Sequence, residues 1–453
     1  MIPALLFALA AWPAAALQAP DAAPDAPRGR AEVWRLDAVE TLDGEAQKNV
    51  TLLVRDGVIE RMGPVVVVPE GARVRDLRGR GAVASPPLVL ARANFLVGDQ
   101  RGSGNASRWR AADSLWLDEG WEKQLLAEGV LFAGVDPPGS GMPGRTSVLQ
   151  AGGGAPRPQA LVEDLYLKIT FAASAQSKDL VRKALKDADE AIEKEQKARE
   201  EWRKARAEWE KKQKEKAEKE KAEAGKGDKA GEGGGRPPAA AQEKEEKEPP
   251  AEFEAPKLAP DVEAVVEWIR KERMAQVFIT SAADWVHWQD LVDDRELPYS
   301  LVLNHAQGQN FHEIVGELAR AGVTIDVPAS ISFLPFTRIR ANLPAELARA
   351  GLERMVLSPA GGSVRDLAEW RAQAARCVAE GLDRARALRA MTLDAAYTLG
   401  LDDRVKALAA TAPANFVVWS GDPLDPLAEA LFVVQDGKVV YDREKEEKEE
   451  ARR

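Results

Sequence analysis

Two polar side chains stand at the end of an apolar strand in the stretch Ala82–Leu96, AVASPPLVLARANFL. Arg92 and Asn94 are two positions apart, so an extended chain turns both to the same side. A guanidinium has donors only and keeps its positive charge, so Arg92 suits an anionic or carboxylate ligand. The alternative is that Arg92 pairs with a carboxylate of the chain itself, such as Asp136. Neither interpretation makes Arg92 a metal ligand, and only the first makes it a ligand-binding residue.

Such a pair needs a frame that holds it at a strand end. Between residues 82 and 404 apolar runs of strand length alternate with helical patterns, which is typical of parallel β/α units. The predicted strands after residue 96 are Gly129–Val135, Gln276–Thr280, Tyr299–Asn304, Val323–Val327 and Arg354–Leu357.

Sites in such folds lie at the carboxyl ends of the strands. We therefore expect one mouth ringed by the residues found there, namely Arg92, Asn94, Asp136, Thr280, His305, Pro328 and Ser358. Of these we expect ligand contacts from Arg92, Asn94, Asp136, Thr280 and Ser358. No catalytic residue is predicted in this set.

The two ends of the chain have a different pattern. Val50–Met62 contains Asp56-Gly57 between apolar runs, and Leu431–Tyr441 contains Asp436-Gly437 in the same arrangement. Both predict β-hairpins, because glycine adopts the positive φ of a tight turn. We expect residues 31–81 and 405–443 to pair into one composite β-sandwich. Two unrelated hairpins are the alternative.

A charged insertion, residues 178–261, interrupts the β/α pattern. Lys178–Ala224 is dense in Lys, Glu and Ala and predicts a long solvated helix, which we expect to rest on the barrel through Trp202 and Trp209. Gly225–Pro260 and the tail 444–453 predict disorder, since they are charged or rich in Gly and Pro. An alternative is that the charged helix is itself the partner-binding element.

The N-terminus and the composition bear on location. Residues 1–19 form a short apolar run that ends in small residues and predicts a signal peptide, followed by a flexible linker at 20–30. The expectation is an exported protein, periplasmic or secreted, without a membrane span after cleavage. The net charge of −10 argues against nucleic-acid partners. Cys377 is the one cysteine and is expected to be a core residue.

Several stretches resemble the amidohydrolase superfamily, in particular its imidazolonepropionase-like exported members. Met391–Val405 (MTLDAAYTLGLDDRV) is similar to a helix of that family, and Ala412–Pro426 with Val434–Tyr441 to its closing strands. Leu53–Gly63 and Gly81–Phe95 resemble its opening strands. The resemblance implies a distorted TIM (β/α)₈ barrel with a composite β-sandwich built from both chain ends. It also implies hydrolysis of carbon–nitrogen bonds by metal-activated water.

The family's metal ligands are mostly replaced in this sequence. Its His-x-His pair falls on Arg92 and Asn94, and its later aspartate falls on Ser358-Pro359. Another histidine position falls near Phe278 or Thr280, whereas His305 matches as a remnant ligand. Lys168 matches loosely a lysine that some members carry. We therefore predict a degenerate metal site and expect no cofactor; an active protein would need a divalent metal such as zinc.

These observations favour an amidohydrolase-like pseudoenzyme that works as a binding or scaffold protein. The partner would be an unidentified small molecule or a protein. The alternative is a metal-dependent hydrolase of non-peptide carbon–nitrogen bonds with an atypical site.

Overall fold

The computed structural model describes residues 30–98, 102–116, 119–153, 159–224, 249–304, 310–361 and 363–452. Both ends of this range contribute to one eight-stranded sheet in the order β20-β19-β18-β5-β1-β2-β3, with β4 also pairing with β1. The ladder between β5 and β18 joins the two chain ends. The strands are β1 (Glu32–Val39), β2 (Gln47–Arg55), β3 (Val58–Gly63), β4 (Arg73–Asp76), β5 (Val83–Ser85), β18 (Phe416–Trp419), β19 (Ala430–Gln435) and β20 (Lys438–Asp442).

This sheet curls around its own core. Trp34 on β1 makes edge-on ring contacts with Phe416 on β18 and Phe432 on β19, at centroid distances of 5.5 and 5.3 Å. Since β1 and β19 are not neighbours in the sheet, only a curved sheet brings these rings together. The chain ends thus share one sheet and are not two unrelated hairpins. It is one continuous sheet rather than two, and it extends to Ser85, beyond the expected boundary at residue 81.

The middle of the chain supplies parallel strands. β6 (Leu88–Ala93) pairs in parallel with β7 (Val130–Val135) in a four-stranded sheet of order β10-β9-β7-β6. A six-stranded sheet of order β17-β14-β13-β12-β11-β8 contains five strands in parallel. These are β11 (Tyr166–Thr170), β12 (Met274–Ile279), β13 (Tyr299–Leu303), β14 (Ile325–Pro328) and β17 (Met355–Ser358).

The two sheets of the middle region are linked through consecutive strands. β8 (Gly141–Arg145) and β9 (Ser147–Gln150) follow one another but pair with β11 and β7 respectively. β10 (Ala160–Val162) pairs with β9, and β15 (Ser332–Phe333) and β16 (Arg340–Ala341) form a separate hairpin. At the other side β17 lies in contact with β6. The described strands therefore form an arc whose carboxyl ends face one region.

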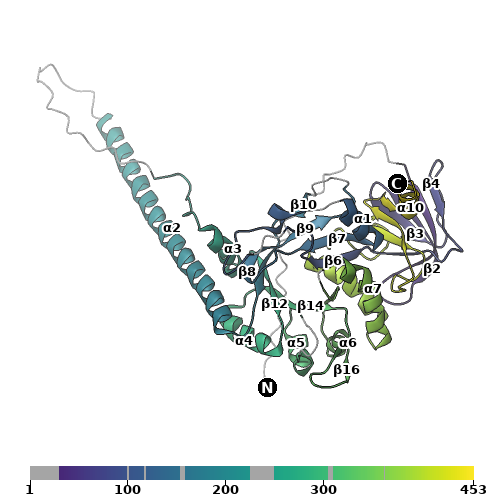
Figure 1. The fold of residues 1–453 in the computed structure, drawn as a ribbon. Coiled ribbons are helices and arrows are strands. Elements are labelled where there is room, and N and C mark those ends of the chain that lie inside the picture. Colours follow the sequence, from purple (N-terminus) through teal and green to yellow (C-terminus); the bar gives the residue numbers. More distant parts are fainter. Residues whose placement is uncertain are drawn as a thin grey trace, which may run out of the picture.

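Helices cover the outer face of this arc (Figure 1). Trp268, Trp288 and Trp370 on three of them are fully buried in the main core. The helices are α1 (Glu119–Ala127), α3 (Pro260–Ile269), α4 (Ala282–Val292), α5 (Val315–Arg320), α6 (Leu343–Arg349), α7 (Val364–Ala379), α8 (Arg384–Met391) and α9 (Leu393–Thr398), with short 3-10 turns at Ala111–Ser114, Asp293–Arg295 and Phe311–Glu313. None of the helices in the described ranges is long and apolar enough to cross a bilayer.

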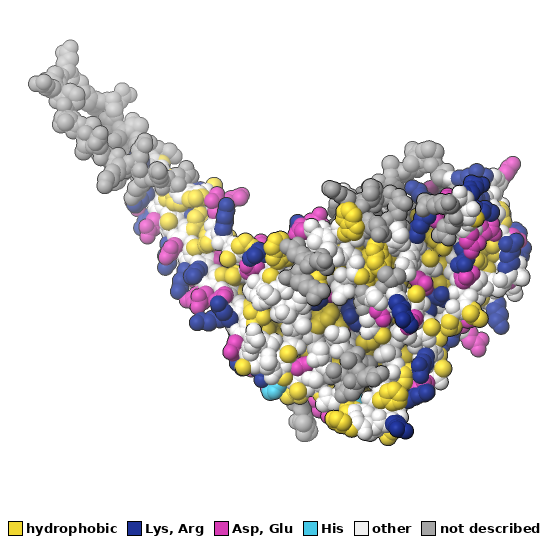
Figure 2. Space-filling model, viewed as in Figure 1, with side chains coloured by type: hydrophobic (Ala, Val, Ile, Leu, Met, Phe, Trp, Pro, Cys, Tyr) yellow, Lys and Arg dark blue, Asp and Glu magenta, His cyan; other side chains and the backbone are white. Residues whose placement is uncertain are grey.

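The long predicted helix is present as α2 (Ala175–Ala224), which leaves the body as a projecting arm (Figure 1). Its base packs into the core through Val181, Ala184, Leu185 and Ala188, each at most 3% exposed. Figure 2 shows Lys, Arg, Asp and Glu side chains side by side along the arm. Residues 211–218 are all exposed. Among the residues that the structure describes, the base of α2 is thus the part that is anchored in the core.

The prediction that the long helix contacts the barrel through Trp202 and Trp209 was wrong. The Trp202 indole Nε1 donates to the Pro250 carbonyl at 2.9 Å, and its ring lies 5.9 Å from that of Phe253. Both partners belong to the returning segment 249–258, not to the barrel. Trp209 contacts the guanidinium of Arg206 on its own helix. The reason is geometric, because a helix that projects outward carries its later turns away from the core.

Two predictions of disorder are corrected. The tail expected to be disordered forms α10 (Arg443–Glu450), where Arg443 pairs with Glu447 one turn later and with Glu429 of the sheet region. Residues 249–259 follow the arm back to α3, which begins at Pro260. The rest of the predicted disordered stretch, 225–248, lies outside the described residues, as do the signal peptide 1–19 and linker residues 20–29.

Candidate functional site

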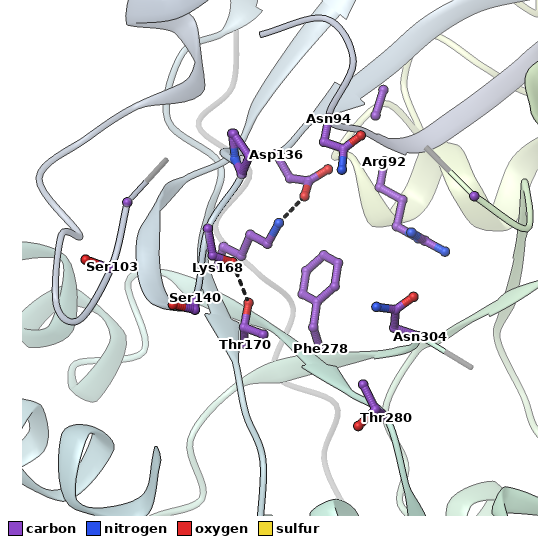
Figure 3. A pocket seen from close by; sticks show the side chains of 15 residues that line it. Arg92, Asn94, Ser103, Asp136, Ser140, Lys168, Thr170, Phe278, Thr280 and Asn304 are labelled. Carbon is purple, nitrogen blue, oxygen red and sulfur yellow. Dashed lines mark hydrogen bonds and ion pairs between the residues drawn. The ribbon is translucent and has the colours of Figure 1, made fainter. Parts of the chain in front are cut away.

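A cavity of about 620 Å³ opens at the carboxyl ends of the parallel strands (Figure 3). Four of the five predicted contact residues line it: Arg92 on β6, Asn94 just after β6, Asp136 just after β7 and Thr280 just after β12. The parallel arrangement explains this, since consecutive strand ends meet at one edge. Its complete lining is Arg92, Ala93, Asn94, Gly102, Ser103, Asp136, Pro138, Gly139, Ser140, Lys168, Thr170, Phe278, Thr280, Asn304 and Gly361.

Three other residues of the predicted mouth have different positions. Ser358, the last residue of β17, is fully buried and does not belong to the lining. Its hydroxyl donates to Asp326 Oδ2 at 2.9 Å, so it acts behind the cavity wall. Pro328, the last residue of β14, is buried as well. His305 lies outside the described residues.

A buried ion pair forms one wall of the cavity. Lys168 Nζ, from β11, donates to Asp136 Oδ2 and also to the Pro137 carbonyl at 3.0 Å. The two charged side chains are only 7% and 6% exposed. The ammonium also lies 4.4 Å from the ring centroid of Phe278, where the π face attracts a cation. The Lys168 amine is thus satisfied from three directions.

A second buried ion pair lies beside the first. Arg92 Nε donates to Asp326 Oδ2 at 3.1 Å, with side-chain exposures of 14% and 3%. The predicted pairing of Arg92 with Asp136 is therefore wrong. Asp136 is taken by Lys168, and Asp326, the second residue of β14, accepts from the guanidinium instead. Two acids and two bases from four strands thus neutralise one another in the centre of the site.

Burial has the largest effect on the pKa of Asp326, the more buried of the two acids. It raises the pKa of Asp326, and the nearby negative charge of Asp136 acts in the same direction. The charge of Arg92 and the hydrogen bonds from Ser358 and Arg92 oppose this change. Asp326 Oδ1 and one terminal nitrogen of Arg92, Nη2, are buried without a hydrogen-bond partner among the described residues. The second pair is therefore less fully satisfied than the first.

Two glycine-rich segments form the rim of the cavity. Gly102 and Gly139 form a parallel bridge, and a Cβ on Gly139 would come within 2.0 Å of the Gly102 carbonyl oxygen. Asp261, at the start of α3, anchors the first segment, because its main-chain carbonyl accepts from Asn105 Nδ2 at 2.9 Å and from Ser107 Oγ at 2.6 Å. Only glycine allows such close backbone contact. The rim thereby brings Ser103 and Ser140 to the cavity.

The described residues do not fit a divalent metal centre. Arg92 and Asn94 occupy the positions at which the resemblance implies a histidine pair, and a guanidinium cannot ligate a cation. The nearest carboxylates already accept from Lys168 and Arg92. Within the described ranges no three His, Cys, Asp or Glu side chains are grouped closely enough to hold a metal ion. His287, on α4, lies 3.6 Å from Asp290, one turn along the same helix, and His312 lies in the turn before α5.

Sequence reasoning missed Asp326 and Asn304 and gave Lys168 little weight. An acid inside the apolar stretch Val323–Val327 was an available indication, since a charged group in a buried strand needs a partner. Asn304 directly precedes His305, and no pattern in the sequence distinguishes it as a cavity residue. The prediction that Cys377 is a core residue is confirmed: its side chain is buried, and burial raises the pKa of its thiol to about 12.

Comparison with known proteins identifies the fold. An amidohydrolase from Thermotoga maritima MSB8 superposes with a TM-score of 0.66 at 19% identity, covering 91% of this chain and all of that one. A beta-aspartyl dipeptidase from Fervidobacterium islandicum AW-1 superposes with a TM-score of 0.50 at 12% identity, covering 91% of this chain and 97% of that one. No family model and no curated protein sequence matches. The expected resemblance is thus confirmed at the level of the fold.

Proposed function

We propose that this chain is a small-molecule-binding protein on the amidohydrolase fold, in which two internal ion pairs replace a metal centre. The observation that carries the proposal is the pairing of Arg92 with Asp326 and of Lys168 with Asp136 at the strand ends. We infer a distorted (β/α)₈ barrel as the frame, with the arc of parallel strands as its wall. No nucleic-acid partner is proposed, given the net charge of −10.

The ion pairs support a binding role in two ways. First, they use Asp136 and Asp326, the carboxylates beside the cavity that could otherwise contact a metal ion. Second, they fix charged side chains that would otherwise be mobile, so the cavity is preorganised and a ligand loses less free energy in ordering it. A cavity of about 620 Å³ lies in the usual range for small-molecule sites.

Metal analysis of the purified full-length chain tests this proposal. We expect substoichiometric zinc, iron and manganese after purification without chelators, and no thermal stabilisation when zinc is added. A metal that binds the folded state would raise the melting temperature by mass action. Near-stoichiometric metal in the pure protein would show the proposal to be wrong.

A metal-dependent hydrolase of non-peptide carbon–nitrogen bonds is the second candidate. It is favoured by the likeness to the Thermotoga amidohydrolase over 91% of this chain. Its test is turnover of amide, cyclic imide and dipeptide substrates by the zinc-loaded and the chelator-treated protein. Turnover that depends on added zinc would establish this candidate, whereas no turnover in either sample would dispose of it.

We also propose that the protein is exported after removal of residues 1–19. The support is the apolar run with small residues at its end. Mass spectrometry of the mature N-terminus checks the proposal. An intact Met1 in protein recovered from the cytoplasmic fraction alone would contradict it.

A further inference from the structure

The cavity contains polar side chains that the two ion pairs do not use. Asn94, Ser103, Ser140 and Asn304 all belong to the lining and are exposed to it. In the part of the chain that the structure describes, none of these four side chains has a hydrogen-bond partner. They come from four separate segments and surround one space (Figure 3). This is the arrangement of a site that receives hydrogen bonds from a ligand.

The charged groups of the site are, by contrast, already paired with one another, although Arg92 Nη2 and Asp326 Oδ1 keep no hydrogen-bond partner among the described residues. Lys168 is held by Asp136 and the Pro137 carbonyl, and Arg92 is held by Asp326. The Thr280 hydroxyl is occupied as well, because it donates to Asp284 at 3.0 Å. A charged ligand would therefore have to compete with a buried partner or add an unbalanced charge. Either event costs free energy in a site with little water.

We propose that the cavity binds a neutral, polyhydroxylated ligand of about monosaccharide size. A carboxamide and a hydroxyl each donate and accept hydrogen bonds, and so does every hydroxyl of a sugar. Phe278 also belongs to the lining, but it is only 7% exposed and its ring lies against the Lys168 ammonium, so the four polar side chains carry the inference. This inference rests on the proposed function, since it names the ligand class of the same site.

The experiment compares pyranoses in which one group is changed: in the uronate a carboxylate replaces the C6 hydroxymethyl group, and in the amino sugar an ammonium replaces the C2 hydroxyl. The full-length protein is titrated by calorimetry with D-glucose, D-glucuronate and D-glucosamine, and with the corresponding galactose and mannose series. We expect the neutral member of at least one series to bind about tenfold more tightly than its charged partners. Its affinity should be the same at low and high salt, because no ion pair forms on binding.

Two variants locate the site. Asn94→Leu and Asn304→Leu should each weaken binding of the neutral sugar by about tenfold, the effect of losing one or two hydrogen bonds. Gln196→Leu, an exposed amide on the arm, is the matched control and should bind as the parent does. Thermal melts of all variants exclude unfolding as the cause, and Ser103→Ala provides a second, smaller substitution at the rim.

The outcomes separate this inference from the proposed function. Absence of binding by every neutral sugar, tighter and salt-dependent binding of a charged member, or unchanged affinity in both asparagine variants would overturn the ligand class. Metal content is measured on the same samples. Stoichiometric metal together with site-dependent sugar binding would overturn the proposed function and leave the ligand class standing. A metal-free protein that prefers glucuronate would overturn the ligand class and leave the proposed function standing.

Discussion

Charged residues serve opposite purposes in the mouth and in the arm. On α2 the pair Glu193–Lys197 is separated by 2.6 Å, yet its side chains are 63% and 68% exposed. In the mouth Arg92 and Asp326 are separated by 3.1 Å with exposures of 14% and 3%. Water screens the first pair, so it contributes little to stability. The second pair has lost its water, so each charge depends on its partner.

The distance between two opposite charges therefore does not by itself show how much the pair contributes to stability. The arm needs its charges for solubility and helix formation, and any one of them is replaceable. The mouth needs each of its four charges because the others would be left buried and alone. The largest effect on stability is expected where the arm meets the body.

Deletion experiments separate the base of α2 from its outer part. Removal of residues 178–261 takes away Val181 and Leu185, whose burial contributes about 3–6 kcal/mol. That is comparable with the whole stability of an ordinary domain, so this deletion should yield insoluble protein. Replacement of residues 211–248 by a short Gly-Ser linker should leave a soluble body with the parent's melting temperature. Equal solubility of both deletions would contradict the assignment of the base to the core.

The buried pair of the mouth is the next largest expected effect. Asp326→Ala leaves the Arg92 guanidinium buried without its partner, which should cost about 3–5 kcal/mol of unfolding free energy. Urea denaturation followed by circular dichroism measures this. Glu193→Ala on the arm is the control and should leave the midpoint unchanged, because both members of that pair are in water. Similar losses for the two variants would remove the distinction between mouth and arm.

The sequence predicted the frame better than the pairings within it. Arg92, Asn94, Asp136 and Thr280 were placed at one mouth because parallel strands bring their carboxyl ends together. The partner of Arg92 was not predictable, because Asp136 follows β7 whereas Asp326 lies inside β14, and only the arrangement of the strands in space shows which carboxylate the guanidinium reaches. The contacts of Trp202 were predicted wrongly for a similar reason. The local sequence does not show whether a long helix packs along the body or projects from it.

The two regions should also respond to acid in opposite ways. Burial raises the pKa of Asp326, so the unfolded chain loses this proton at lower pH than the folded one. Its contribution to stability is therefore present below its ordinary pKa of 3.8 and is lost as pH rises through the folded value. The hydrogen bond from Arg270 lowers the pKa of Glu195 on the arm, so its contribution is present above 4.5 and is lost as pH falls.

Denaturation at a series of pH values tests these signs. The stability difference between the parent and Asp326→Asn should decrease with rising pH, whereas that between the parent and Glu195→Gln should increase. The second slope should be shallow, because the partners of Glu195, Arg270 and Arg199, are 33% and 48% exposed and their charges are partly screened. Slopes of the same sign for both substitutions would show that the two environments do not differ as proposed.

The smallest expected effect lies where the arm meets its returning segment. Trp202→Ala removes the hydrogen bond to the Pro250 carbonyl and the ring contact with Phe253, together about 1 kcal/mol of local stability. Amide exchange in residues 251–258 should then be several times faster, while the global unfolding midpoint stays unchanged. Trp209→Ala is the matched control, because its ring contacts the Arg206 side chain on the same helix. If Trp202→Ala instead lowered the global midpoint, the outer arm would be part of the cooperative core, and the contrast between a screened arm and a tightly coupled mouth would fail at this point.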